Sequence, residues 1–187
     1  MINDQTPDEF IIRRVQNGFI EPFRLIVERY ENKIFSMGMR FFYNHDDSLD
    51  FTQEVFLKAY DRIHQYREIA PFKFWLVKLA YNLGINMKKK RGQEYDFDDS
   101  ILEGRGPGPD KIYADKELKN VILKEIAELP ERYRVCLDLY FFFGLKYAEI
   151  SEITGYPLNT IKSDVLRAKK ILRQNLKDTI AGSYDEM

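Results

Sequence analysis

The stretch EISEITGYPLNTIKSDVLRAKKIL, residues 149–172, contains the signals of two helices separated by a tight turn. Gly155 follows the segment EISEIT and can adopt the left-handed conformation that ends a helix. Beyond it, apolar residues recur at intervals of four, three and four, which predicts one buried face: Ile161, Val165, Ala168 and Leu172. A short helix, a glycine turn and a basic helix from about residue 158 to 177 together predict a helix-turn-helix.

The opposite face of the second helix is polar and basic, as expected for a helix that enters the major groove of DNA. Arginine suits guanine, hydroxyl groups suit several bases, leucine suits the thymine methyl group, and lysines suit phosphates. The candidate DNA-contact residues are Asn159, Thr160, Lys162, Ser163, Leu166, Arg167 and Lys170.

An acidic residue, Asp164, interrupts this basic helix. A helical wheel places it on the flank, nearer to the buried edge than to the centre of the DNA-facing side. We predict that Asp164 pairs with Arg167 one turn further on, or accepts a hydrogen bond from a cytosine amino group. It therefore stays among the candidate DNA-contact residues.

The net charge of −1 conceals a segregation of charge along the chain. Residues 73–91 contain six lysines and arginines and no acid, and residues 158–177 contain six against one acid. Between them, residues 93–110 contain six acids against one arginine. Two basic segments separated by an acidic one favour nucleic acid as a partner.

The composition is that of one or two small globular domains, since 44% of the 187 residues are hydrophobic and 32% are charged. No apolar run reaches the roughly 18 residues of a membrane span, and the N-terminus MINDQTPDEF does not resemble a signal peptide. We therefore expect a cytoplasmic protein. Cys136 is the only cysteine, which excludes a disulfide or a thiolate zinc site within one chain.

We expect an all-α fold of two small helical domains joined by a flexible linker. The stretch GRGPGPD, residues 104–110, cannot continue a helix, because glycines are too free and prolines lack the backbone N–H. With the acidic run before it, this stretch predicts a linker over residues 92–112. Residues 1–91 and 113–187 then form the domains, and their apolar residues recur at helical spacing without strand alternation.

The segment PFKFWLVKLAYNLGINMKKKR, residues 71–91, begins with a proline suited to the first turn of a helix. A step of about 100° per residue separates two faces. The expected buried face consists of Phe72, Leu76, Leu79 and Leu83, and the expected outer face of Phe74, Lys78, Tyr81 and Lys88. Rings beside lysines suit unpaired bases, because the ring stacks on the base and the lysine attracts the phosphate. We expect Trp75 to belong to the core.

Three further stretches resemble conserved segments of bacterial sigma factors: DDSLDFTQEVFLKAY (46–60), PFKFWLVKLAYN (71–82) and LPERYR (129–134), followed by the helix-turn-helix. The resemblance is closest to the small extracytoplasmic-function group, because the linker leaves no room for the middle domain of larger members. It extends in the same order from about Phe10 to Leu176. The chain departs from the family pattern at Ser48, Leu49, Asn159 and Asp164.

The resemblance implies a factor that binds core RNA polymerase, through its β′ and β subunits, and directs it to promoter DNA. It implies no cofactor, no covalent chemistry and no small-molecule substrate, and it implies an anti-sigma partner. The first domain would bind the polymerase and the −10 element, with the loop at residues 65–70 receiving a flipped-out base. The second domain would bind the −35 element.

Residue roles follow from the resemblance position by position. Polymerase contacts would be Asp50, Gln53, Glu54, Phe56 and Leu57. The −10 contacts would be Tyr66, Arg67, Lys78, Tyr81, Asn82, Lys88 and Lys89. The −35 contacts would be the candidates of the second helix, Asp164 included. For Phe56, the apolar spacing with Leu49 and Ile63 fits a core position equally well.

Three other interpretations remain. Asp61 and His64 have the i, i+3 spacing of di-metal carboxylate bundles, but a second such segment is missing. A helix-turn-helix regulator acting without core polymerase would explain the last helices and leave the basic aromatic helix without a role. A sigma-like adaptor that has lost transcription activity would explain the departures from the family pattern.

Overall fold

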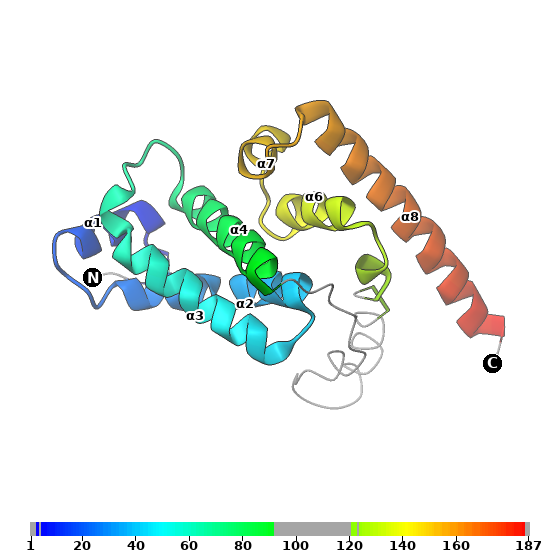
Figure 1. The fold of residues 1–187 in the computed structure, drawn as a ribbon, viewed down its shortest axis with the longest axis horizontal. Helices are drawn as coiled ribbons and strands as arrows, with labels where there is room; N and C mark the ends of the chain where they lie inside the picture. Colours follow the sequence, from blue (N-terminus) through cyan, green and yellow to red (C-terminus); the bar gives the residue numbers. More distant parts are fainter. Residues whose placement is uncertain (1–2, 4, 92–120, 123, 186–187) are drawn as a thin grey trace. The chain divides into compact units, whose positions relative to one another are not determined.

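The computed structural model describes residue 3, residues 5–91, residues 121–122 and residues 124–185 (Figure 1). The chain divides into two compact units, Met1–Asp98 and Asp99–Met187, which are described separately. Every regular element among the described residues is helical, so the expected all-α fold is confirmed. The expected linker, residues 92–112, lies outside the described residues.

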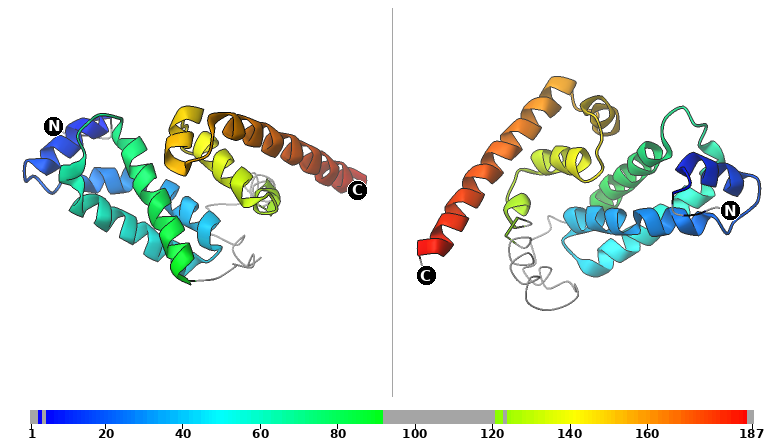
Figure 2. Two further views of the ribbon diagram at one scale, coloured as in Figure 1. Left: turned by 45° about the horizontal axis from the view of Figure 1, so that its top comes forward. Right: turned by 180° about the vertical axis from the view of Figure 1, so that it is seen from behind.

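The first unit contains α1 (Asp8–Gln16), α2 (Phe23–Phe42), α3 (His45–Asp61), the 3-10 helix η1 (Ile63–Gln65) and α4 (Phe72–Arg91). α2 and α3 are consecutive and run side by side, and α4 contacts both of them as well as α1 (Figures 1 and 2). Large side chains from all four α-helices are fully buried between them: Ile11, Ile12, Ile26, Ile34, Met37, Phe42, Phe51, Phe72 and Leu76. α4 is therefore covered on more than one side.

The turn between α2 and α3 brings the two helices close together. Tyr43 ends α2 in the left-handed region with a φ of 48°, and the Asn44 side chain accepts a hydrogen bond from the Asp47 N–H at 3.0 Å. Asn44 is therefore the N-cap of α3. Gly38 lies where the helices meet, since a Cβ there would be 2.9 Å from the Phe51 ring. The close approach requires glycine.

The second unit contains α6 (Glu131–Phe141), α7 (Tyr147–Thr154) and α8 (Leu158–Asp185). Pro130 directly precedes α6, and α8 continues past residue 177, where the sequence predicted its end. α6 lies along α8, and α7 contacts both (Figure 1). Their shared core includes Cys136, Leu139, Phe143, Ile150, Ile161, Val165 and Ala168.

The described residues contain neither a membrane-spanning helix nor a metal-binding cluster. No helix in this part of the chain is both long and apolar enough to cross a membrane. Within the same residues, no group of three or more histidines, cysteines or acids is placed to hold a metal ion.

Candidate nucleic-acid and polymerase interfaces

α7, Gly155 and α8 form the predicted helix-turn-helix (Figure 2). Gly155 has a φ of 75°, in the left-handed region where a side chain would be strained. The Ser151 hydroxyl donates to the Tyr156 carbonyl at 2.6 Å, and the Thr154 hydroxyl accepts from the Tyr156 N–H at 3.2 Å. These bonds hold the turn that sets the direction in which α8 leaves α7.

The first turns of α8 expose most of the predicted DNA-contact residues. Ile161, Val165 and Ala168 are completely buried, which confirms the buried face read from their spacing. The predicted contacts lie away from this buried face. Thr160 and Ser163 are half-buried, and Leu166 is 65% accessible. The other predicted contacts are also exposed: Asn159, Lys162, Arg167 and Lys170. The exposed face thus combines cations with groups that can reach base edges.

Asp164 does not belong to this exposed face, and its predicted pairing with Arg167 is wrong. Its side chain is 0% accessible, because α6 covers that flank of α8. Arg132 of α6 approaches it, with Nε 2.6 Å from Oδ2 and Nη2 donating to Oδ1 at 3.2 Å. The acid in the basic helix is therefore neutralised inside the second unit by a residue 32 positions earlier in the chain.

Lys169 occupies the other flank of α8. Its ammonium group lies 5.1 Å from the centre of the Tyr140 ring and 4.7 Å from that of Phe141. Tyr140 in turn stacks on Tyr147 at 5.0 Å. A cation over aromatic rings is held by their quadrupoles, so Lys169 joins α8 to the end of α6.

α4 carries a second basic surface. Lys78 and Lys88 are half-buried, whereas Asn82 and Lys89 are exposed. Helical geometry places Lys78, Asn82 and Lys89 within about 40° of one another, so they form one strip. The Lys78 ammonium lies 5.9 Å from the centre of the Phe74 ring. This strip therefore carries the positive charge that the sequence predicted for the helix.

The aromatic part of the prediction for α4 is wrong. Phe74 and Tyr81 were expected on the outer face, but each is only 7% accessible. Tyr81 packs against Phe41 of α2 at 5.9 Å between ring centres, because α4 contacts α1, α2 and α3 and its buried arc is wide. These rings cannot stack on bases in this conformation. Trp75, expected in the core, is half-buried.

The loop before α4 also differs from the prediction in one residue. Tyr66 is buried, and its hydroxyl donates to the Ala70 carbonyl at 2.9 Å, so it closes the loop from inside and does not face outward. Burial, followed by the nearby Glu9 carboxylate, raises the pKa of Tyr66 to about 12. Arg67, the other predicted contact in this loop, is exposed.

α3 presents the candidate polymerase contacts. Asp50 and Gln53 are exposed, Glu54 is half-buried and pairs with Lys58 at 2.6 Å, and Leu57 is 61% accessible. Helical geometry puts Asp50, Gln53, Glu54 and Leu57 within about 100° of arc. They form an exposed polar surface with an apolar side chain in it.

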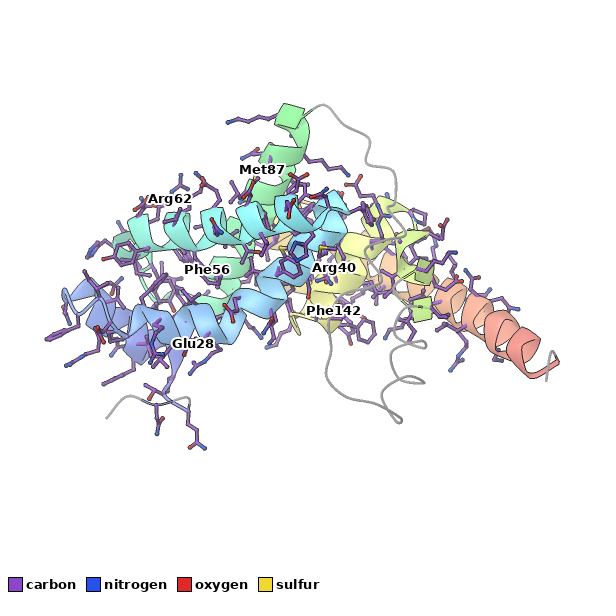
Figure 3. The ribbon with its side chains drawn as sticks, turned by 90° about the horizontal axis from the view of Figure 1, so that it is seen from below. Glu28, Arg40, Phe56, Arg62, Met87 and Phe142 are labelled. Atoms are coloured by element: carbon purple, nitrogen blue, oxygen red, sulfur yellow. The ribbon has the colours of Figure 1, made fainter. Side chains whose placement is uncertain are left out.

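Phe56 is excluded from this surface. It is 7% accessible and points between α2 and α3, so it belongs to the core of the first unit (Figure 3). Of the two roles left open for Phe56, the core position is the one that the structure shows. Leu57, the next residue, is the more exposed of the two large apolar side chains that α3 presents to solvent, at 61% against 41% for Leu49.

Comparisons with known proteins match both units. The family model for sigma-70 region 2 matches residues 26–94, and the model for sigma-70 region 4 matches residues 119–172. Two solved structures have similar folds with TM-scores of 0.66: CnrH in complex with the cytosolic domain of CnrY (15% identity, 91% of this chain and 97% of that one) and RpoE with the anti-sigma factor NepR from Bartonella quintana (24% identity, 83% and 96%).

Curated relatives extend this match over almost the whole chain. The ECF RNA polymerase sigma-E factor of Escherichia coli K12 is 29% identical, with 96% of this chain and 99% of the relative covered. The ECF RNA polymerase sigma factor SigW of Bacillus subtilis is 30% identical over 178 residues, which cover 89% of this chain and 95% of the relative. With both sigma regions present in order and a relative at this identity matched nearly end to end, this chain belongs to the ECF RNA polymerase sigma factors.

Proposed function

We propose that this sigma factor binds core RNA polymerase through α3, holds the −10 element of a promoter with α4 and the loop before it, and reads the −35 element with α8. The polymerase carries out the chemistry, and this chain acts as a transcription regulator without catalysis of its own. Residues 92–112 join the two DNA-binding units in this proposal.

The exposed face of α8 is the observation that carries the proposal. Arg167 can donate two hydrogen bonds to guanine, and Leu166 can pack against a thymine methyl group. Lys162 and Lys170 suit phosphates, which position a helix in the groove without selecting a sequence. With Asp164 neutralised by Arg132, no exposed carboxylate stands among the predicted contacts on this face.

α4 supports the −10 part through charge more than through stacking. Lys78, Asn82 and Lys89 form a strip that suits a DNA strand, with cations for phosphates and an amide for a base edge. Phe74 and Tyr81 are left out of the proposed contacts because they are buried. Arg67 extends the positive surface into the preceding loop.

The polymerase contact is proposed for the surface of α3 formed by Asp50, Gln53, Glu54 and Leu57. An exposed leucine surrounded by polar and charged groups has the anatomy of an interface with an apolar centre and a polar rim. An anti-sigma partner is part of the proposal, because CnrH and RpoE, whose folds are similar, were solved in complex with the CnrY cytosolic domain and the anti-sigma factor NepR.

Transcription of fragmented genomic DNA by core polymerase plus this protein, followed by sequencing of the transcript starts, tests the proposal and returns both promoter elements. We expect defined starts that require both components. Specific DNA binding by the protein alone, with no effect on core polymerase, would support the regulator interpretation instead.

A variant pair tests the −35 assignment. Arg167→Ala should lower discrimination at one −35 position by about 1–3 kcal/mol. Lys177→Ala removes one exposed charge ten residues further along α8 and serves as the matched control. An equal loss at all positions for Arg167→Ala would mean that the arginine contacts only phosphate.

A further inference from the structure

Three side chains on one face of α1 hold the segment between α3 and α4. Gln16 donates through Nε2 to the carbonyls of Ile63 and Tyr66, at 2.8 and 2.9 Å. Arg13 forms a two-pronged ion pair with Glu68, and Glu9 accepts from the Phe72 N–H at 3.1 Å. Their i, i+4 and i+7 spacing aligns these three side chains along α1. Figures 1 and 2 both show α1 beside this loop.

The held loop has an unusual shape. Glu68 has a φ of 58°, in the left-handed region that residues other than glycine rarely adopt. The bidentate contact from Arg13 fixes this residue, and their mutual hydrogen bond raises the pKa of Arg13 and lowers that of Glu68. Tyr66 stabilises the loop from its buried side. Its hydroxyl donates to the Ala70 carbonyl, and its ring packs on that of Phe72 with 5.3 Å between the ring centres. The backbone from 63 to 72 is thus held at both ends and at its middle.

The held loop displays an apolar side chain at its tip. Ile69 is 91% accessible, more than any other large apolar residue among those described, and Arg67 beside it is exposed. The loop leads directly into α4, so its tip lies at the start of the helix that carries Lys78 and Asn82. Apolar side chains held in this way insert beside bases where stacking is broken. A loop fixed before binding loses less entropy when it binds.

We propose that α1 is a clamp which holds the loop of residues 67–70 in the shape that contacts the unpaired −10 strand, with Arg13 and Gln16 as positioning residues and Ile69 as the contact residue. This inference rests on the proposed function. The clamp gives the first helix of the chain a part in promoter opening, although α1 itself touches no DNA in this proposal.

The test uses the protein bound to core polymerase and a fluorescent single-stranded DNA that carries the −10 sequence found by mapping transcript starts. Arg13→Ala should lower affinity for this strand at least tenfold and leave affinity for core polymerase unchanged. Arg24→Ala is the control, because it removes another surface arginine–glutamate pair, with Glu28 at 2.8 Å and with both partners inside α2, so that no loop residue takes part. It should behave as the parent protein.

Two further variants separate positioning from folding. The exchange of Arg13→Glu with Glu68→Arg should restore part of the lost affinity, because it rebuilds the pair. Ile69→Ser should lower strand affinity without changing the thermal midpoint, because an exposed side chain contributes little to the core.

The outcomes are distinguishable. If the parent protein binds core polymerase and the −10 strand, and Arg13→Ala and Ile69→Ser bind the strand equally well, the clamp is overturned while the proposed function stands. If the parent protein itself gives no polymerase-dependent binding of the strand, the proposed function fails first. Recovery in the exchanged pair together with loss in both single variants supports the clamp.

Discussion

The ion pair between Arg132 and Asp164 should stabilise the second unit. The loss in free energy of unfolding caused by Arg132→Ala should measure this stabilisation. Removing one partner of a buried pair costs about 3–5 kcal/mol when both groups are buried. Here the Asp164 carboxylate is completely buried, but the Arg132 side chain is 47% accessible, so water screens part of the interaction. For the buried carboxylate left without its donor we expect the lower cost of about 1–3 kcal/mol.

Cys136 provides a measurement specific to this unit. It is the only cysteine and is buried on α6, so a thiol reagent reaches it only when the second unit opens. In a urea series, the midpoint of Cys136 labelling should fall by about 1 M for Arg132→Ala, given a slope of about 1–3 kcal/mol per M. Asp164→Asn keeps the size of the side chain and removes its charge.

A double-mutant cycle completes the argument. If the pair interacts directly, Arg132→Ala should cost clearly less when Asp164→Asn is already present. Lys177→Ala, which removes an exposed charge from α8, should leave the midpoint unchanged. An unchanged midpoint for Arg132→Ala, or strictly additive costs in the cycle, would refute the reasoning that this pair ties α6 to α8.

Three shorter predictions concern other elements. Leu57→Asp should weaken binding to core polymerase at least tenfold, whereas Ile20→Asp, at an equally accessible position outside α3, should not; a pull-down titration with core enzyme decides. Gly155→Ala should cost about 1–2 kcal/mol in the labelling assay, because no atom blocks a Cβ there but φ is 75°, and Gly155→Asn should cost less. Burial raises the pKa of the Cys136 thiol from 9.0 to about 12, so the unfolded chain loses this proton at a lower pH than the folded chain does. The free energy of unfolding should therefore fall as pH rises above about 9, and Cys136→Ala should abolish the part of this fall that the thiol causes.

Much of the fold could be predicted because its signals are local. The spacing of Ile161, Val165 and Ala168 predicted the buried face of α8, and Gly155 predicted the turn before it. The Asn44 cap at the start of α3 is a signal of the same local kind, since an N-cap acts within one turn. The exposed cations of α8 followed from the same helical wheel.

The predictions for single residues failed where a side chain packs against an additional part of the fold. Tyr66, Phe74 and Tyr81 were assigned to exposed surfaces, and Phe56 to either a surface or the core; all four are buried. A helical wheel describes one face against one partner, whereas α4 contacts three other helices, which makes its buried arc wider than a stripe. The contacts between α1 and the 63–72 segment could not be predicted, because 47 to 63 positions separate the partners.

By itself, the sequence determined that this protein is helical, that it ends in a helix-turn-helix and that its charges gather in two basic helices, because periodicity, caps and charge are properties of neighbouring residues. Only the tertiary structure decided which of those residues face outward. Asp164 lies on a flank of α8 whose exposure depends on whether another helix covers it, and α6 brings Arg132 there from 32 residues away. A wheel cannot contain that contact, since packing between distant segments sets both the burial of the acid and the partner that neutralises it.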